Sequence, residues 1–254
     1  MAPVTEIEYS SGDRVADVHF DLGERNTFTL AGFEAIAAAA EVALANRSVR
    51  CIVFASDVRG YFSDGFALAD LFGSAAHTEA AARDYSHYDA VVRQFERLLR
   101  IPVPTIAFVD GLCRGAGFEF AMAADFLVAT ANSSFGLHEV RLGIVPGLGG
   151  AGFLQDRVRS SIGRYRLLSG DIVSFEFAQE HDMIDLAVAS LAEAHEQFVR
   201  PLARRTRAAL VRTKGWLGHQ ETKLRHLADC REGFLSSLSD RLLRHDTQEL
   251  EDFP

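Results

Sequence analysis

Three glycine-containing segments hold the residues whose types and spacing could do chemistry. The first, Tyr61–Asp70, places Gly65 where the chain passes from a short loop into the expected start of a helix. The second, Asp110–Asp125, places Gly115 and Gly117 at a similar junction. Glycine allows a tight turn, and the first N–H groups of the helix that follows have no partner inside it. Such N–H groups can hold a developing negative charge, although the first segment is also typical of an ordinary glycine turn.

Two glutamates lie beside glycine-rich turns. Glu119 comes one helical turn after the second segment's glycines and has apolar neighbours, so its carboxyl group is either desolvated, with a raised pKa, or paired. Glu139 belongs to the third segment, Ser134–Gly150, in a loop or short strand that Leu142 and neighbouring apolar residues would anchor. If the fold brings the two carboxyl groups together, they could act as a general acid and a general base. The spacing also fits a Glu119 that caps the scaffold and a Glu139 that is solvated.

Other catalytic and binding motifs are absent from the sequence. The second segment lacks the Gly-Lys-Ser/Thr ending of a phosphate-binding loop, and Phe120 stands where a dinucleotide fingerprint requires its third glycine. No Gly-x-Ser-x-Gly motif occurs, and the histidines and cysteines show no metal-ligand spacing. We therefore expect no metal site and no redox cofactor.

Several other polar or aromatic residues are expected to be structural. Asp64 is expected to be a solvated turn residue, and His138 is expected at the surface or at the rim of a pocket. Asp125 is expected to cap or pack the scaffold. The arginine-rich run Arg200–Arg212 predicts a solvated helix face, with phosphate binding as the alternative. Phe234, late in the chain, is expected in the core or at an interface.

An alternation of strands and helices must position these residues. Two runs separated by Ser-Gly-Asp predict a hairpin, Glu6–Ser10 with Arg14–Phe20. Short apolar runs predict buried strands, and apolar residues at helical spacing predict helices. The further expected strands are Arg50–Ala55, Thr105–Val109, Ala124–Ala129 and Ile184–Val188, and the expected helices are Thr29–Asn46, Thr78–Leu99, Ala116–Ala123, Gly163–Leu168 and Ser174–Glu180.

This alternation predicts an α/β fold with parallel sheets. After residue 189 the pattern is helical up to about His245, with no strand signal. We therefore divide the chain into an α/β core, residues 1–188, and a helical C-terminal region, residues 189–254. No internal repeat, low-complexity segment or linker suggests another boundary.

Composition and charge limit the classes of function. The chain has 254 residues, of which 48% are hydrophobic and 24% are charged, an average composition for a globular protein. Its net charge of −9, without a long basic run, predicts neither nucleic-acid binding nor attachment to a membrane surface. The three scattered cysteines predict free thiols in a reducing compartment, and no signal peptide or membrane span is visible. We therefore expect a cytoplasmic protein.

Together, the three glycine-containing segments resemble the enoyl-CoA hydratase/isomerase (crotonase) superfamily. The resemblance runs from about Ile7 to Ala189. It is strongest over Gly111–Gly150, which shows the pattern Gly-x-x-x-Gly-x-Gly-x-Glu…Ala-x-Asp…Phe-Gly-x-x-Glu-x-x-Leu-Gly-x-x-Pro-Gly-x-Gly-Gly. It implies a crotonase-like spiral of ββα units with a helical C-terminal trimerisation region, assembled as a homotrimer or homohexamer.

The resemblance also implies a chemistry. The substrate would be an acyl thioester of coenzyme A, with coenzyme A as part of the substrate and no further cofactor. The backbone N–H groups of Phe66 and Ala116 would form an oxyanion hole for the thioester oxygen. Glu119 and Glu139 match both catalytic glutamates of the family's hydratases, in which one carboxylate activates water for attack at C3 and the other supplies the proton at C2. The expected activity is therefore that of an enoyl-CoA hydratase.

Departures from the family pattern keep other activities open. Ala67 stands where an Asp is usual, and Phe66 is bulkier than the common Ala. A thioester isomerase, a decarboxylase, a lyase, a carrier other than coenzyme A or a catalytically inactive binding protein would also fit. The substrate-binding residues expected from the resemblance are Arg25, Gly65, Ala67, Leu68, Gly115, Leu142, Pro146 and Gly147.

Overall fold

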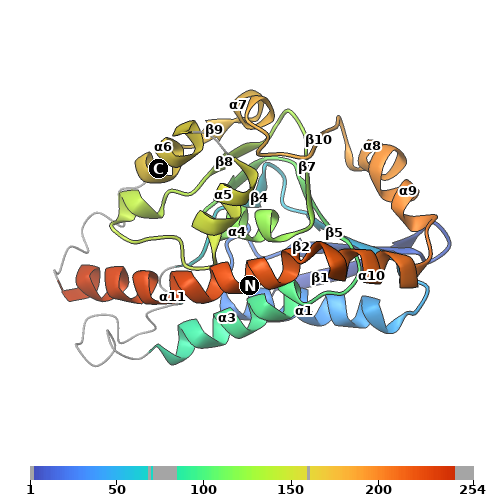
Figure 1. Ribbon diagram of the computed structural model, residues 1–254, viewed down its shortest axis with the longest axis horizontal. Coiled ribbons are helices and arrows are strands. Elements are labelled where there is room, and N and C mark those ends of the chain that lie inside the picture. The colour runs from blue at the N-terminus through green and yellow to red at the C-terminus, as the bar shows by residue number, and fades with distance from the viewer. Residues whose placement is uncertain (1–2, 68–69, 71–84, 159–160, 244–254) are drawn as a thin grey trace.

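The computed structural model describes residues 3–67, 70, 85–158 and 161–243. Two sheets and the helices that cover them make up the molecule (Figure 1). The start of the helix expected over Thr78–Leu99 and the substrate contact expected at Leu68 lie outside the described residues. In the described part of the chain, no helix is long and apolar enough to cross a membrane.

The larger sheet has six strands in the order β1-β2-β3-β5-β7-β10. Strands β1 (Val4–Ser10) and β2 (Val15–Asp21) form the expected antiparallel hairpin. The other pairs are parallel, which confirms the expected α/β class. These parallel partners are β3 (Cys51–Ser56), β5 (Thr105–Val109), β7 (Phe126–Ala129) and β10 (Leu186–Ala187).

A smaller sheet was not expected from the sequence. It contains β4 (Tyr61–Ser63), β6 (Leu112–Arg114), β8 (Ser134–Gly136) and β9 (Val173–Ser174), in that order. Its strands have two or three residues each, too few for a period-two pattern to be recognised. Strands β4, β6 and β8 each follow a strand of the larger sheet, and a helix or helical turn comes later in each unit. This repetition is the spiral of ββα units that the resemblance implied.

The expected core helices are confirmed wherever they are described, and one further helix, Gly150–Arg157, follows the third glycine-rich segment. The core helices are α1 (Leu30–Ala45), α3 (Ser86–Leu99), α4 (Ala116–Ala123), α5 (Gly150–Arg157), α6 (Ser161–Ser169) and α7 (Phe175–Glu180). The side chain of Thr29 caps α1 by accepting a hydrogen bond from Gly32 N at 3.1 Å. Of these helices, α4 leads directly out of the second glycine-rich turn and contains Glu119.

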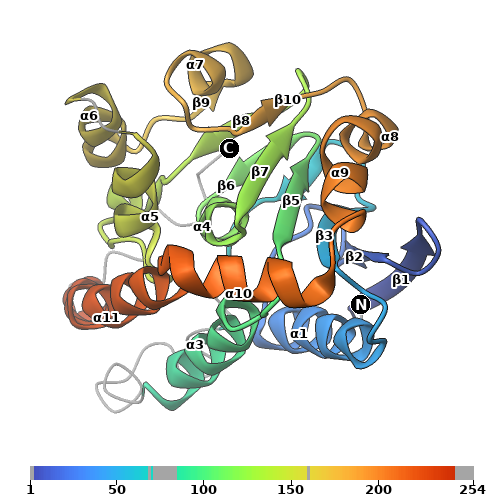
Figure 2. The same cartoon turned by 45° about the vertical axis from the view of Figure 1, so that its right-hand side comes forward.

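The end of the described chain is helical, as expected. It comprises α8 (Leu191–Ala194), a π-helical turn η4 (His195–Val199), α9 (Arg200–Ala203), α10 (Arg207–Leu217) and α11 (His219–Leu243). Helix α11 contacts both α3 and α5, and Figures 1 and 2 show it between these two helices. The C-terminal helices therefore cover the core of their own chain.

Phe120 is the centre of an aromatic cluster that holds α4 in place. Its ring centroid lies 5.2 to 6.4 Å from those of five other phenylalanines, Phe20, Phe28, Phe33, Phe54 and Phe62. Most of these pairs have the edge-to-face geometry that aromatic rings favour. Phe120, which stands where a dinucleotide fingerprint has its third glycine, thus fixes the helix that contains Glu119 against both sheets.

A partly buried ionic cluster holds the other end of α4. Asp125, just beyond this helix, accepts a hydrogen bond from Thr105 N. It also forms an ion pair with Lys214, whose Nζ lies 2.6 Å from Asp125 Oδ2. Lys223 donates to the carbonyl oxygens of Ala123 and Ala124 at 2.8 Å each. Positive charge is favourable at a helix C-terminus. The chain's only two lysines thus bind α10 and α11 to the end of α4, and Asp125 has the structural role expected of it.

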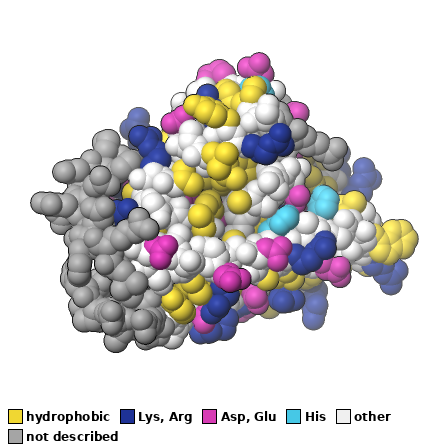
Figure 3. Space-filling model, turned by 60° about the vertical axis from the view of Figure 1, so that its left-hand side comes forward, with side chains coloured by type: hydrophobic (Ala, Val, Ile, Leu, Met, Phe, Trp, Pro, Cys, Tyr) yellow, Lys and Arg dark blue, Asp and Glu magenta, His cyan; other side chains and the backbone are white. Residues whose placement is uncertain are grey.

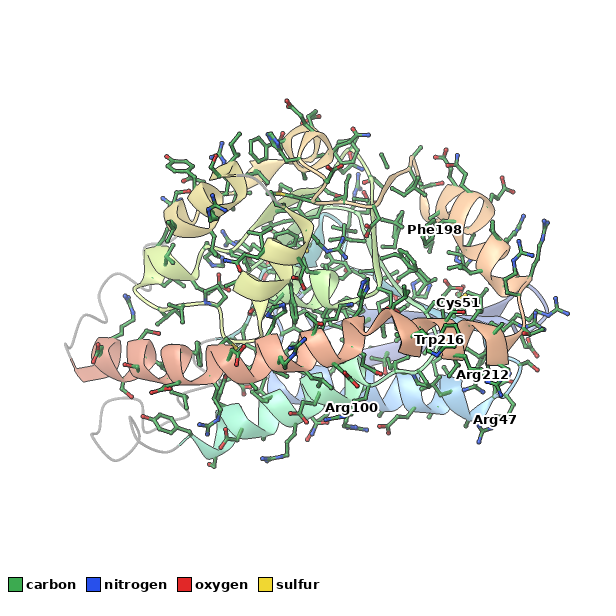
Figure 4. All side chains as sticks on the ribbon, viewed as in Figure 1. Arg47, Cys51, Arg100, Phe198, Arg212 and Trp216 are labelled. Carbon is green, nitrogen blue, oxygen red and sulfur yellow. The ribbon has the colours of Figure 1, made fainter. Side chains whose placement is uncertain are left out.

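A second apolar cluster lies between the larger sheet and the helices that follow it. Cys51 of β3 and Phe198 of η4 belong to this cluster (Figure 4). Helix α10, by contrast, has no buried residue, and Trp216 is 92% exposed. Arg212 is exposed on the same helix (Figure 4), in agreement with the expected solvated face of the arginine-rich run.

The surface carries charges of both signs. On the face shown in Figure 3, hydrophobic side chains gather on the upper part, and Lys and Arg alternate with Asp and Glu along the lower part. Such mixing gives this face no extended positive field of the kind that a nucleic acid requires.

Replacing the central ring of the aromatic cluster should destabilise the whole domain. Phe120→Ala removes a fully packed side chain, and we expect the free energy of unfolding to fall by about 3–5 kcal/mol. Urea unfolding followed by circular dichroism measures this change. A fall below about 1 kcal/mol would show that the neighbouring rings close the cavity and that Phe120 does not fix α4.

Candidate active site

A cavity of about 160 Å³ lies where the glycine-rich turns meet α4, α3 and α11. Its wall includes Glu119 and Glu139, and also Phe66 and Ala116. The structure thus brings together four residues that are up to 73 positions apart (139 − 66) in the sequence. The rest of the wall is mostly apolar, which keeps charged groups inside the cavity poorly solvated.

Parallel pairing of β4 with β6 places the two glycine-rich turns next to each other. Gly65 follows β4 and Gly115 follows β6, with φ angles of 95° and 53° that favour glycine. The approach is so close that a Cβ atom on Gly115 would lie 3.5 Å from the Cα atom of Gly65. A side chain on Gly115 would also crowd the carboxyl group of Glu139, at 3.2 Å from Oε1.

The backbone N–H groups of Phe66 and Ala116 have no hydrogen-bond acceptor among the described residues. Phe28 N donates to Gly65 O and Ala67 N donates to Phe28 O, so the N–H of Phe66 between them faces away from Phe28. Ala116 is the first residue of α4, where an N–H has no partner within the helix. Within the described residues, neither N–H group donates to a protein acceptor. Both are available to an oxygen atom in the cavity.

Glu119 is buried at the cavity wall and held in one orientation. Its side chain is 2% exposed, and Oε1 accepts hydrogen bonds from Leu148 N and Gly150 N at 2.8 Å each. Burial raises the pKa of this carboxyl to about 7, and the backbone N–H groups of Gly150, Leu148 and Gly147 oppose the rise. The glycine-rich end of the third segment therefore serves to fix Glu119.

Glu139 has no comparable support. It begins a 3₁₀ helix, η3 (Glu139–Leu142), rather than lying in the expected loop or strand. It is 8% exposed, so the solvated Glu139 that the sequence also allowed is wrong. Its Oε2 is buried and accepts no hydrogen bond from the described residues. Burial and the nearby charge of Glu119 raise its pKa well above the usual value.

The two carboxyl groups therefore differ in how readily they lose a proton. Glu139 Oε2 accepts no hydrogen bond from the described residues, and burial and the charge of Glu119 hold the pKa of Glu139 well above its usual value. Glu119 has two such bonds and a pKa near neutrality, so it loses its proton first. The cavity thus contains one group able to accept a proton and one able to donate a proton.

The predicted substrate-binding residues divide into two groups. Gly115, Leu142 and Gly147 lie on the cavity wall. The other described members of the predicted set, Gly65, Ala67, Arg25 and Pro146, are not on the wall formed by the described residues. Among these, Gly65 contacts the second turn, and Arg25 forms an ion pair with Asp64 at 2.5 Å.

Sequence reasoning missed two aromatic residues of the wall. Tyr88 of α3 stacks on Phe234 of α11 with ring centroids 4.7 Å apart, and its hydroxyl donates to Gly147 O at 2.7 Å. Phe234 is in the core, as expected, but it also closes the cavity. No local motif marks either residue, because the two side chains meet only when α3 and α11 pack together.

The expectation of a solvated Asp64 is wrong. Its side chain is 8% exposed and forms ion pairs with both Arg25 and Arg114. Arg114 and His138 also line the cavity. Burial and the positive charge of Arg114 lower the pKa of His138 to about 4, so its ring is neutral at physiological pH. A polar cluster thus lies beside the two glycine turns.

Comparison with protein families decides the relationship of this chain. The family model described as Enoyl-CoA hydratase/isomerase matches residues 11–240, a range that contains both turns and both glutamates. This chain belongs to the enoyl-CoA hydratase/isomerase family. The membership confirms the resemblance that was visible in the glycine-rich segments.

Several curated hydratases of this family are similar in sequence. Human mitochondrial methylglutaconyl-CoA hydratase is 34% identical over 140 residues, 55% of this chain and 40% of that protein. The 2,3-dehydroadipyl-CoA hydratase of Escherichia coli is 33% identical over 176 residues, 68% of this chain and 66% of that protein. The aligned part of this chain thus spans less than half of the human relative's length.

Solved structures confirm the crotonase fold. Enoyl-CoA hydratase from Bacillus halodurans superposes with a TM-score of 0.80 at 20% identity, covering 94% of this chain and 99% of that one. A methylmalonyl-CoA decarboxylase bound to 2-nitronate-propionyl-CoA superposes with a TM-score of 0.78 at 21% identity, covering 96% and 92%. At these identities the likeness establishes the fold of this family member and not its reaction.

The raised pKa of Glu119 should make the stability of this family member depend on pH. Between the unfolded value of 4.5 and the folded value of about 7, the folded state binds more protons, so stability falls as pH rises through this range. Glu119→Gln removes the titrating group and keeps an oxygen for Leu148 N and Gly150 N. We therefore expect its melting temperature, relative to the wild type, to be higher near pH 8 than near pH 5.

Differential scanning fluorimetry at the two pH values measures this offset. Glu41→Gln, which changes an exposed glutamate on α1, is the matched control. An offset for Glu119→Gln that is the same at both pH values would contradict a raised pKa at this position.

Proposed function

We propose that this chain is an enoyl-CoA hydratase, which adds water across the 2,3 double bond of an enoyl thioester. The observation that carries the proposal is the pair of buried carboxyl groups, Glu119 and Glu139, in one cavity with two unused N–H groups. The named activities of the curated relatives support it, since methylglutaconyl-CoA and 2,3-dehydroadipyl-CoA hydratases both hydrate coenzyme A thioesters.

The N–H groups of Phe66 and Ala116 would bind the thioester oxygen. Attack of water at C3 moves the electrons of the double bond toward this oxygen. The thioester thereby becomes an enolate whose negative charge lies on this oxygen. Two donors fixed before the reaction stabilise that charge, and one such donor typically lowers the barrier by about 2.7–4 kcal/mol.

The difference between the pKa values of the two carboxyl groups assigns a role to each glutamate. Glu119, the carboxylate, would take a proton from water while the water oxygen bonds to C3. Glu139, the protonated acid, would deliver its proton to C2 as the enolate collapses. The product is a 3-hydroxyacyl thioester, and one proton moved from Glu119 back to Glu139 restores the starting state.

A hydratase explains the cavity better than the other activities do. An isomerase needs one group that moves a proton between C2 and C4, and loss of carbon dioxide needs no base. Neither reaction explains a second buried carboxyl group whose Oε2 lacks a protein partner, a costly arrangement in a folded protein. For the same reason a catalytically inactive binding protein is the less favoured alternative. Assembly as a homotrimer or homohexamer and a cytoplasmic location stay predictions.

Removing either proton-transfer group should abolish most of the hydration. We expect Glu119→Gln and Glu139→Gln each to lower kcat by about 10²–10⁴-fold, because each variant loses general acid or base catalysis. The assay follows loss of the enoyl thioester absorbance, with Glu41→Gln as control. Mass spectrometry of the product made in ¹⁸O-labelled water separates the reactions, since only hydration introduces one labelled oxygen. An unlabelled product of unchanged mass would show that the chain is an isomerase and not a hydratase.

The N–H group of Ala116 can be removed with proline. Ala116 is the first residue of α4, where proline is tolerated, and Gly115 has φ 53° and ψ −132°. These angles mirror the extended conformation preferred before proline, and glycine adopts either hand. Ala116→Pro should therefore fold and lose about 10²–10³-fold in kcat, as other oxyanion-hole deletions do.

Ala116→Val keeps the N–H group and serves as the steric control. Circular dichroism checks that both variants fold before turnover is compared. A folded proline variant with wild-type kcat would show that Ala116 is not an oxyanion donor.

A further inference from the structure

An ion pair connects the two glycine turns at equivalent positions. Asp64 lies two residues before Phe66, and Arg114 lies two residues before Ala116. Arg114 Nε donates to Asp64 Oδ1, so the pair joins the segments that lead to the two unused N–H groups. Both side chains line the cavity.

The backbone pairing of the two strands is interrupted near this point. Strands β4 and β6 pair in parallel at Tyr61 with Leu112 and at Ser63 with Cys113, and the register shifts between these two pairs. A bulge of this kind bends a strand and disrupts its ladder of hydrogen bonds. Asp64 and Arg114 occupy the next position along each strand, where a side-chain contact can take over from the ladder.

The ion pair is buried and braced from a second side. The side chains of Asp64 and Arg114 are 8% and 12% exposed, so water screens their attraction weakly. Arg25 Nε lies 2.5 Å from Asp64 Oδ2, and Asp64 N donates to Arg25 O at 3.1 Å. Asp64 is therefore fixed on the side of the first turn and offers its other oxygen to the second turn.

We propose that the Asp64–Arg114 ion pair is a positioning contact that sets the spacing of the two oxyanion donors, Phe66 N and Ala116 N. The proposal rests on the proposed function, because it assigns a purpose to the pair only if a thioester oxygen binds between these donors. Neither residue needs to touch the reacting atoms.

Correct spacing matters because oxyanion donors act over a narrow range. They must lie about 2.7–3.1 Å from the position of the oxyanion, and a misplacement of about 1 Å can lower a rate by about 10²-fold. Each turn is anchored separately, the first by Phe28 N to Gly65 O and the second by Gly115 N to Gly136 O. Among the described residues, the ion pair is a direct side-chain link between one anchored turn and the other.

Two variants break the pair from opposite sides. Asp64→Asn removes a negative charge, and Arg114→Met removes a positive charge. Loss of spacing should lower kcat in both by about 10–10²-fold, with KM changed by less than about threefold. Arg114→Lys, which keeps the charge, should recover most of the loss. A purely electrostatic role would instead move the pH–rate profile in opposite directions in the two variants.

Arg157→Met is the matched control. Arg157 is 13% exposed and forms an ion pair with Asp185 at 2.8 Å, but it lies on α5 and does not line the cavity. Removing this arginine should cost similar packing and leave kcat unchanged.

A spectroscopic measurement separates positioning from turnover. The infrared carbonyl stretch of bound butanoyl-CoA, labelled with ¹³C at the thioester carbon, falls in frequency when two donors engage the oxygen. We expect this fall in the wild type and in Arg157→Met, and a smaller fall in Asp64→Asn and Arg114→Met at equal ligand occupancy. Full retention of the fall in the two variants would overturn the positioning proposal alone. No fall in the wild type would overturn the oxyanion hole itself, and with it both proposals.

Discussion

Burial of two carboxyl groups in one cavity is the constraint on which the rest of this structure depends. Glu119 and Glu139 share one small cavity, and burial raises the pKa of each. Such burial costs folding free energy unless hydrogen bonds offset it. The chain provides those bonds unequally, with two backbone donors for Glu119 and none among the described residues for Glu139 Oε2. This inequality gives two identical side chains in one cavity different environments and different pKa values.

The scaffold offsets the cost of burying Glu119 by fixing both ends of the short helix α4 that contains this residue. At its start, α4 presents the N–H of Ala116 to the cavity, and one turn later it presents Glu119. Phe120, the next residue, faces the aromatic cluster, so the same helical turn carries the site and the core contact. At its end, Lys223 binds the carbonyl oxygens of Ala123 and Ala124. An eight-residue helix, too short to be stable alone, is thereby fixed by its neighbours.

The sequence predicted most of the larger sheet and the helices, because continuous apolar runs mark strands such as β5 and apolar residues at helical spacing mark helices. It missed β4 and β6, whose three residues each are too few to show a period. It also misjudged Asp64, since a lone Asp before a glycine is typical of a solvated turn. The partners of Asp64, Arg25 and Arg114, are distant in the chain, and the parallel pairing of β4 with β6 brings Arg114 to Asp64.

The aromatic end of the cavity shows why local patterns could not define the whole site. Tyr88 and Phe234 come from α3 and α11, which the sequence predicted as helices without indicating that they cross. Through this stacking, α11 forms part of the wall of a cavity whose other walls come from the core. Because Tyr88 also donates to Gly147 O, in the segment that fixes Glu119, the position of α11 is coupled to the carboxylate through three contacts. The C-terminal region is therefore part of the cavity wall, and its packing is linked to the segment that holds Glu119.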